Sequence, residues 1–344
     1  MKTSECSIFL CTFANAIGEI SLHLYISFCD QMDSKDVLVS INCLVYNHEP
    51  FLRKCLDGFL MQETTFAFEV IVHDDASTDG STDIIREYAK SFPDIIKPMY
   101  EEENQFSKNG AFALEKRMFQ ASSPTSKYIA LCEGDDYWTD PHKLQRQFEA
   151  LEKYPACSFC STGFRIVKKD GYNEDVTIYD NGSDVSFYGI ESWTKKWVHQ
   201  PLTLFIRKDV YDFCMEELSK YYRPKDAHVI YYLFKKGRCV YIPCCMGVYN
   251  ESGLGVWSSK SYSQQIAMNL KVRRDLYKNN GNDPDVYPHY MLYIFTNLKN
   301  LDTKNHLQLL GEGMREATSW KDRMKLMKSY LVFVKHRILC CICH

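Results

Sequence analysis

The first half of the chain repeats one pattern three times: an apolar run, a short polar turn, and a segment whose apolar residues have helical spacing. The apolar runs cover residues 37–46, 68–72 and 128–132. Each run is nearly continuous in apolar residues, as burial of both faces of a strand requires. Strands that alternate with helices predict an α/β fold with a Rossmann-like, mostly parallel sheet flanked by helices.

The polar turns lead into amphipathic segments. After the first run, apolar side chains recur at the spacing of one helix face: Leu52, Cys55, Leu56, Phe59 and Leu60. After the second run, one side of the predicted helix carries Ile84, Ile85, Tyr88 and Ala89. The third helix is predicted to begin at Asp140, a good N-cap residue, with Pro141 in the first helical position.

The second half of the chain is less regular. Residues 157–167 and 239–250 read as strands, residues 226–236 read as a helix, and the chain after Trp257 becomes helical and rich in Lys and Tyr. These changes predict a domain over residues 36–258 and a C-terminal helical region over residues 259–344. Residues 1–35 form an N-terminal extension in this interpretation. Our hypothesis is that the start codon is placed too far upstream, because the domain begins just after Met32.

The C-terminal tail is basic and amphipathic. Residues 321–344 carry six Lys or Arg against one acidic residue, Asp322. One predicted helix face holds apolar side chains, with Lys325, Lys328 and Lys335 off it: Met327, Tyr330, Leu331, Val334 and Ile338. Such a helix fits the surface of an anionic membrane or packs on its own domain, and the sequence leaves both open.

Charge and cysteine content narrow the class of protein. The formal net charge is −3, which gives no sign of a nucleic-acid partner. The 15 cysteines are odd in number and scattered, and several lie inside apolar runs. Buried free thiols in a reducing compartment are therefore expected. We predict a cytoplasmic protein, with peripheral contact at the cytoplasmic membrane face through the basic tail.

Carboxylates follow directly after two of the predicted strands. Glu133, Asp135 and Asp136 come after the run 128–132, and Asp74 and Asp75 come after the run 68–72. In such sheets ligands bind at the carboxyl ends of the strands, so these side chains should surround one crevice. Oxygen-only ligands suit Mg²⁺ or Mn²⁺, ions that commonly bind phosphate oxygens. A diphosphate-containing substrate is indicated, and the plain alternative is an acidic loop that caps the next helix.

Other phosphate-binding motifs are missing from the sequence. No G-x-G-x-x-G follows a strand and no G-x-x-x-x-G-K-[ST] occurs, which disfavours dinucleotide dehydrogenases and P-loop NTPases. A sugar-nucleotide pyrophosphorylase should carry a Gly-rich, basic N-terminal loop, and "LVYNHEPFL" has neither feature.

Three motifs in order resemble a known family. "VSINCLVYNHEPFLRKCLDGFLMQ", "FEVIVHDDASTDGSTDII" and "YIALCEGDDYWTDPHKLQRQ" are similar to the nucleotide-sugar domain of family 2 glycosyltransferases with the GT-A fold. The closest resemblance is to the bacterial type that builds surface polysaccharides. The resemblance covers residues 36–258, and three motifs in this order are more specific than any one of them.

The resemblance implies roles for the residues that bind the donor. Val45, Tyr46 and Asn47 match the motif that lines the nucleoside pocket. Asp75, or its neighbour Asp74, matches the acidic residue that accepts the uracil N3–H of a UDP-sugar. Asp135 matches the metal-binding residue of the D-x-D motif, and Asp136 lies close to the sugar. Glu133 replaces the first Asp of that motif and can bind the metal through water.

The resemblance also implies a catalytic base and an acceptor region. Asp226, at the start of a predicted helix, matches the base of inverting members, although Lys225 stands where an acidic residue is usual. His199 and Trp257 fall in the acceptor region, with a structural histidine as the alternative for His199. Asn250 and Ser252 replace the Arg and His that the closing loop of the family typically carries.

The implied function is an inverting, metal-dependent transfer of a sugar. The donor is a nucleotide-diphosphate sugar, expected to be a UDP-sugar, and the acceptor is a hydroxyl of a glycan or lipid-linked sugar in surface polysaccharide synthesis. The rival interpretation is a non-catalytic carbohydrate- or nucleotide-sugar-binding protein that keeps the fold. The changes at Lys225, Asn250 and Ser252 motivate this rival, and the presence of Asp75, Asp135 and Asp226 argues against it.

Overall fold

The computed structural model describes residues 36–177, 182–191, 199–251, 260–297 and 303–342, with the backbone alone for residues 303–306 and 336–342. The predicted extension at residues 1–35 lies outside this description. The strands are β1 (Val37–Val45), β2 (Ala67–Asp74), β3 (Ile96–Tyr100), β4 (Tyr128–Leu131), β5 (Tyr137–Trp138), β6 (Cys157–Lys168), β7 (Asn173–Val176), β8 (Ser186–Tyr188), β9 (Phe205–Arg207) and β10 (Arg238–Glu251). The helices of the α/β part are α3 (Glu49–Leu60), α4 (Ser81–Ser91), α5 (Gln105–Asn109), α6 (Ala111–Ala121), α7 (Lys143–Lys153), α8 (Lys208–Leu218) and α9 (Asp226–Lys236).

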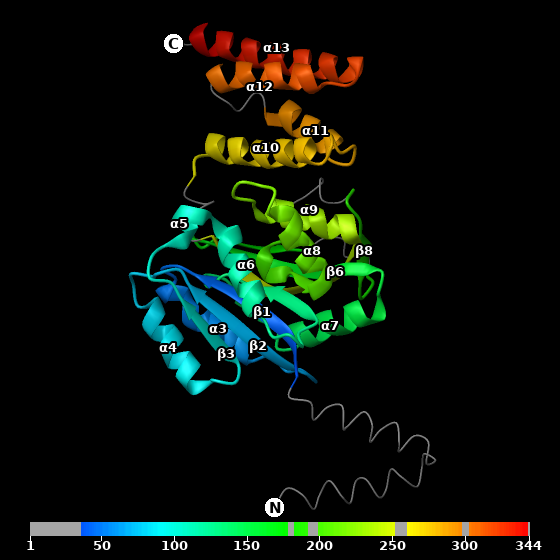
Figure 1. The fold of residues 1–344 in the computed structure, drawn as a ribbon. Helices are drawn as coiled ribbons and strands as arrows, with labels where there is room; N and C mark the ends of the chain where they lie inside the picture. The colour runs from blue at the N-terminus through cyan, green and yellow to red at the C-terminus, as the bar shows by residue number, and fades with distance from the viewer. Residues whose placement is uncertain (1–35, 178–181, 192–198, 252–259, 298–302, 343–344) are drawn as a thin grey trace, which may run out of the picture.

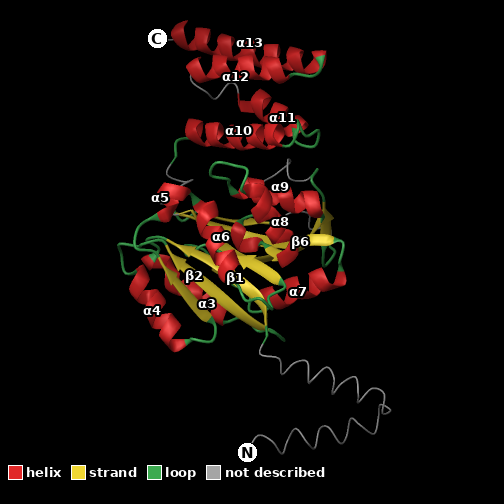
Figure 2. Cartoon of the chain, viewed as in Figure 1, coloured by secondary structure: helices red, strands yellow, loops and turns green. Residues whose placement is uncertain are grey.

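The strands form one sheet with helices packed against it (Figures 1 and 2). Its order is β3-β2-β1-β4-β9-β6-β10-β5, with β7 beside β6 and β8 beside β10. The first four strands are parallel, which confirms the prediction for the N-terminal half. Strand β9 runs antiparallel to both β4 and β6, while β6 and β10 are parallel to each other, so the second half of the sheet is mixed.

The helix faces predicted from apolar spacing are buried. Helix α3 buries Leu52, Cys55, Leu56 and Phe59, and α4 buries Ile84, Ile85 and Tyr88. The third helix, α7, begins at Lys143 rather than at Pro141. The Asp140 carboxylate accepts the His142 N–H at 2.8 Å and its carbonyl accepts the Lys143 N–H at 3.2 Å, which closes a turn ahead of the helix.

Trp138 anchors the segment that follows the Glu133–Asp136 loop. Its indole N–H donates to the Leu202 carbonyl at 2.9 Å, and its ring meets Phe59 edge-on with centroids 4.8 Å apart. The buried ammonium of Lys143 lies 4.2 Å from the centre of the Trp138 ring. Burial lowers the pKa of Lys143 to about 8. Trp138 is thus held by three contacts, which fix the end of the acidic loop.

Within the described residues after 259, helices α10 (Tyr262–Asn279), α11 (Tyr287–Asn297), α12 (Thr303–Glu316) and α13 (Trp320–Ile342) extend from one end of the α/β part. Helix α10 packs beside α9, and α12 and α13 form the outermost layer (Figure 1). Buried Asp283 joins the two parts, since it accepts hydrogen bonds from Tyr231 and, at 3.0 Å, from Lys235. The boundary predicted after residue 258 falls outside the described residues and stays a prediction. None of the helices in the described ranges has an apolar stretch long enough to cross a lipid bilayer.

Candidate active site

The carboxyl ends of β1, β2 and β4 meet at one edge of the sheet. The Asp75 N–H donates to the Val45 carbonyl at 2.9 Å, and the Gly134 N–H donates to the Leu44 carbonyl at 2.9 Å. A Cβ on Gly134 would lie 2.8 Å from Val45 Cγ2, so glycine lets this loop close onto β1. The predicted nucleoside and metal segments are therefore neighbours.

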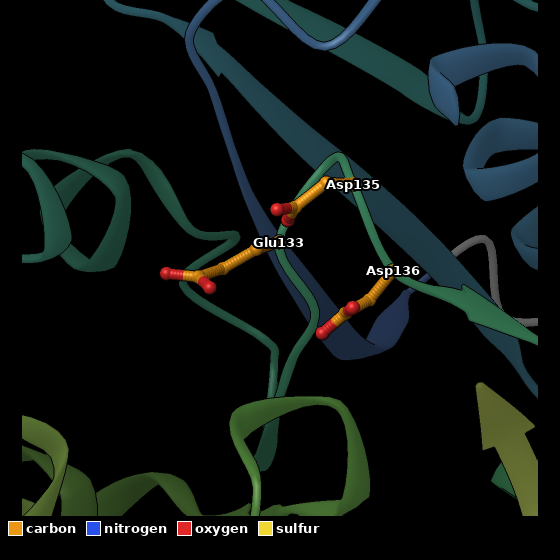
Figure 3. Close-up of side chains that lie close together, drawn as sticks. All are labelled: Glu133, Asp135 and Asp136. Atoms are coloured by element: carbon orange, nitrogen blue, oxygen red, sulfur yellow. The ribbon is translucent and has the colours of Figure 1, made fainter. Parts of the chain in front are cut away.

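The loop after β4 presents three carboxylates (Figure 3). One oxygen each of Glu133, Asp135 and Asp136 lies within 4.8 Å of the others. Asp136 is 1% exposed; its Oδ1 accepts the Asn250 N–H at 2.9 Å, while its buried Oδ2 has no protein partner. Three carboxylates with one unpaired buried oxygen are a donor set that fits a hard divalent cation.

The pKa shifts of the carboxylates in this cluster also favour a bound cation. Glu133 is exposed on one side, while the surrounding protein displaces part of its water and the charges of Asp135 and Asp226 add repulsion. Both effects raise the pKa of Glu133 well above its usual range. Burial and the Asp135 charge raise the pKa of Asp136 in the same way. A bound cation would relieve this repulsion.

Asp226 is the first residue of α9, and its charge acts on Glu133 of the acidic loop. Desolvation raises its pKa, against the opposing charge of Lys225. Its own charge raises the pKa values of Glu133 and Glu115, which places the three carboxylates close enough to interact. The structure therefore brings Asp226 together with the acidic loop, although the chain separates them by about 90 positions.

Glu115, on α6, is a site residue that sequence reasoning missed. The Tyr211 hydroxyl donates to its carboxylate at 2.9 Å, and the buried Asn42 amide lies beside it. Desolvation, with a smaller contribution from Asp226, raises the pKa of Glu115 to about 7 against the effect of the Tyr211 hydrogen bond. A glutamate on an amphipathic helix gives no signal. Asn42, a polar residue in the middle of a buried apolar strand, is the sequence feature that could have indicated a polar partner.

The predicted nucleoside-pocket residues have different surroundings. Val45 is buried and Tyr46 is 42% exposed. Asn47 has a positive φ of 56°, and its side-chain oxygen accepts the Thr78 N–H at 2.7 Å. Its own N–H donates to Ser77 Oγ at 3.0 Å, so Asn47 ties the loop after β1 to the loop after β2.

Asp74 and Asp75 are buried and hold loops in place. The Asp74 carboxylate accepts from the Ser77 N–H at 3.1 Å and the Thr82 hydroxyl at 2.5 Å. The Asp75 carboxylate accepts the Gln105 and Phe106 N–H groups at 2.6 and 2.9 Å. These bonds are structural roles that the sequence did not reveal. Each carboxylate oxygen has a second lone pair, which leaves acceptor capacity for a ligand.

His48 was also missed. Its Nε2 lies 3.9 Å from an oxygen of Asp135, and Asp74 is close enough to act on its charge. Burial lowers the pKa of His48, against the opposing effect of Asp135. This histidine therefore lies between the acidic loop and the end of β2.

The acceptor-region residues fare differently. His199 is 3% exposed, accepts or donates a hydrogen bond with Ser161 at 3.1 Å, and packs between the rings of Phe159 and Phe234. Burial lowers its pKa to about 3, so the ring is neutral, which favours the structural alternative. Trp257 and Ser252 lie outside the described residues.

Asn250 has a defined structural task at the end of β10. Its backbone N–H binds Asp136, and its side-chain amide donates to the Asp135 carbonyl at 2.5 Å. The residue thereby locks the acidic loop onto β10. The departure from the family pattern at this position therefore supports the geometry of the carboxylates.

Several known proteins share part of this sequence. An uncharacterized protein of Mycobacterium tuberculosis is 32% identical over 222 residues, which cover 64% of this chain and 61% of that protein, so the match spans less than two thirds of the relative. TuaG of Bacillus subtilis, named as a candidate teichuronic acid biosynthesis glycosyltransferase, is 32% identical over 41% of this chain and 52% of its own length.

A solved structure shares the fold. TarS residues 1–349 of S. aureus, in complex with UDP-GlcNAc, superimpose with a TM-score of 0.56 at 13% identity, covering 88% of this chain and 92% of TarS 1–349. This likeness confirms the predicted α/β fold with C-terminal helices. Residues 40–212, half of the chain, match the sequence profile described as Glycosyl transferase family 2. The chain therefore belongs to glycosyl transferase family 2.

Proposed function

We propose that the chain is an inverting, metal-assisted glycosyltransferase that moves a sugar from a nucleotide-diphosphate donor to an acceptor hydroxyl. One observation carries the proposal: three carboxylates cluster in the acidic loop after β4, and Asp226 of α9 lies close enough for its charge to act on Glu133 of that loop. Family membership supports sugar transfer as the chemistry of this crevice.

Asp135 and Asp136, with Glu133 directly or through water, would hold Mg²⁺ or Mn²⁺. When bound, the ion supplies positive charge that stabilises the departing diphosphate. Asn250 keeps the loop in position for this task, since it binds Asp136 and the Asp135 backbone. His48, whose Nε2 lies 3.9 Å from an oxygen of Asp135, offers a hydrogen-bonding group beside this loop.

Asp226 is the proposed base. Its carboxylate takes the proton from the acceptor hydroxyl while that oxygen forms a bond to the anomeric carbon. The bond from the anomeric carbon to the phosphate oxygen breaks, and the nucleoside diphosphate leaves with the electron pair. Attack from the face opposite the leaving group inverts the anomeric centre. Desolvation by the surrounding protein raises the pKa of Asp226 above its usual range, which makes its ionised form a stronger base than an ordinary aspartate.

UDP is the proposed nucleotide. Val45, Tyr46 and Asn47 would line the nucleoside pocket, and Asp75 or Asp74 would accept the uracil N3–H with a free lone pair. The complexes of TarS with UDP-GlcNAc and UDP lend support through a shared fold. Tyr46, 42% exposed beside this edge, offers a ring on which a base can stack.

The proposed acceptor is a hydroxyl of a glycan or of a lipid-linked sugar used in surface polysaccharide synthesis. The name of TuaG, which refers to teichuronic acid biosynthesis, supports this assignment. We place the protein in the cytoplasm. Unbonded thiols support a reducing compartment, for example Cys43 and Cys55, whose sulfurs lie 3.9 Å apart in the core.

Nucleotide binding tests the crevice. The melting temperature of the purified chain is measured with UDP, GDP, dTDP or CDP, each with Mn²⁺ and with EDTA, for the wild type and Asp135→Asn. We expect Mn²⁺-dependent stabilisation by UDP that the variant loses. No stabilisation by any nucleotide would contradict the proposal. Stabilisation without sugar transfer to any acceptor tried would favour the rival binding protein.

A further inference from the structure

The outermost helix, α13, presents two different faces. Its inner face is buried: Leu326 is 0% exposed and Phe333 is 7% exposed. Gly313 of α12 makes room for this contact, since a Cβ there would lie 2.8 Å from Leu326 Cδ2 and 3.3 Å from Ile294 of α11. The orientation of α13 about its own axis is therefore fixed by packing.

The opposite face carries an exposed apolar stripe. Trp320 is 73% exposed, Met324 39%, Met327 40% and Leu331 60%. Their spacing of i, i+4, i+7 and i+11 places them on one line along a helix with 3.6 residues per turn. The sequence grouped Met327 and Leu331 with Tyr330 and Val334, whereas the structure turns these last two partly inward. The side chain of Ile338 lies outside the described residues.

Basic side chains border the stripe. Arg323 falls on one side of it, and Lys321, Lys328 and Lys335 fall on the other; all four are exposed. The acidic residue of this segment, Asp322, is turned inward, where it accepts from Tyr287 at 2.9 Å and from Ser319 at 2.8 Å. The outer face of α13 is therefore apolar along its centre and positive along both edges.

From this arrangement we propose that α13 docks the protein on an anionic lipid bilayer. The helix would lie along the membrane interface, with the apolar stripe of its outer face turned toward the lipid acyl chains. Four large apolar side chains flanked by cations match a surface with an apolar interior and negative headgroups. The length and charge of the helix fit a helix that lies on the membrane, and α13 is in the outermost layer of the molecule, clear of the sheet (Figure 1). The inference rests on α13 alone and stands whether or not the crevice transfers sugar.

The test is co-sedimentation of the full chain with phosphatidylglycerol vesicles and with phosphatidylcholine vesicles. We expect binding to the anionic vesicles that weakens with added salt and is much weaker on the zwitterionic ones. Trp320→Ser and Leu331→Ser should each lower the partition coefficient about tenfold. Lys328→Gln and Lys335→Gln should each lower it about fivefold. Tyr172→Ser and Lys169→Gln, exposed in the turn between β6 and β7, are matched controls that should bind as the wild type does.

Two further measurements keep the inference refutable. Vesicles should shift the tryptophan emission of the wild type to the blue, and the Trp320→Phe variant should lose that shift. Trp320 is exposed and phenylalanine is also aromatic, so this substitution should not disturb folding. Vesicle binding that is unchanged by substitutions in the apolar stripe and at the lysines would overturn the proposal. So would concentration-dependent self-association that Leu331→Ser abolishes without any vesicle binding, because a second copy of the chain would then be the partner of this face.

Discussion

Replacing Glu115 with Gln should make the protein more stable at neutral pH and leave it unchanged in acid. The crevice raises the pKa of Glu115 from the ordinary 4.5 to about 7. Below about pH 4.5 the carboxyl is protonated in both the folded and the unfolded chain. As the pH rises to about 7, the unfolded chain releases this proton while the folded one keeps it, so the stability contributed by the protonated group is lost.

The magnitude follows from the same values. A difference of about 2.5 in pKa corresponds to at most about 3.4 kcal/mol, at 1.36 kcal/mol for each pKa unit. Glu115 is partly exposed, so water screens part of this effect and we expect about 1–2 kcal/mol. The groups that act on Glu115 are Tyr211 of α8, Asp226 of α9 and Asn42 of β1. Glu133 of the acidic loop also lies within range of its charge. Glutamine retains an acceptor for the Tyr211 hydroxyl, so the substitution removes the ionisation and keeps that hydrogen bond.

The assay is urea unfolding of the wild type and Glu115→Gln at several pH values between about 5 and 8, with EDTA present. The difference in unfolding free energy should grow with pH and level off above about pH 7. Glu102→Gln, at an exposed position near the start of α5, is the control and should show no such growth. A difference that stays flat with pH would refute the placement of Glu115 in a desolvated acidic crevice.

Three other substitutions separate structural from functional roles. Gly134→Ala places a methyl 2.8 Å from Val45 Cγ2 and should lower the free energy of unfolding in urea by about 1–3 kcal/mol. The folded variant should also lose Mn²⁺-dependent nucleotide binding, and binding equal to that of the wild type would contradict this expectation. Asn250→Ala removes the side-chain bond to the Asp135 carbonyl and should weaken Mn²⁺-dependent binding of UDP in calorimetry, while an unchanged affinity would show that Asn250 does not hold the loop. His199→Leu should lower the melting temperature but keep kcat/KM for the acceptor, whereas a specific rise in acceptor KM would restore the acceptor role.

Much of the fold could be predicted, because it follows from the spacing of apolar residues and from the order of strands and helices along the chain. The buried faces of α3 and α4 follow from apolar spacing, and the parallel strands follow from their alternation with helices. The antiparallel insertion of β9 between β4 and β6 could not be predicted, since "FIR" is a short run whose partners come from distant parts of the chain. The start of α7 depends on a turn closed by the Asp140 carboxylate, a local competition that propensity does not resolve.

Some residues of the site could likewise be predicted from the sequence, and others could not. Carboxylates at strand ends are readable, because parallel strands place them at one edge, and the acidic loop indeed clusters. Glu115 and His48 were missed because their roles come from burial beside other groups, which a sequence without its fold does not display. Asp74 and Asp75 show the converse. The sequence indicates only a functional role for them, whereas the structure shows that their carboxylates also accept hydrogen bonds from the loop backbone.

The most direct test of the central claim is turnover at Asp226. Release of UDP from a panel of UDP-sugars is measured with Mn²⁺, for the wild type and Asp226→Asn, together with the affinity of each protein for UDP. We predict that the variant binds UDP as the wild type does and loses about 10²–10⁴ in kcat. Equal turnover in the two proteins would contradict the assignment of the base and with it the proposed reaction in this crevice.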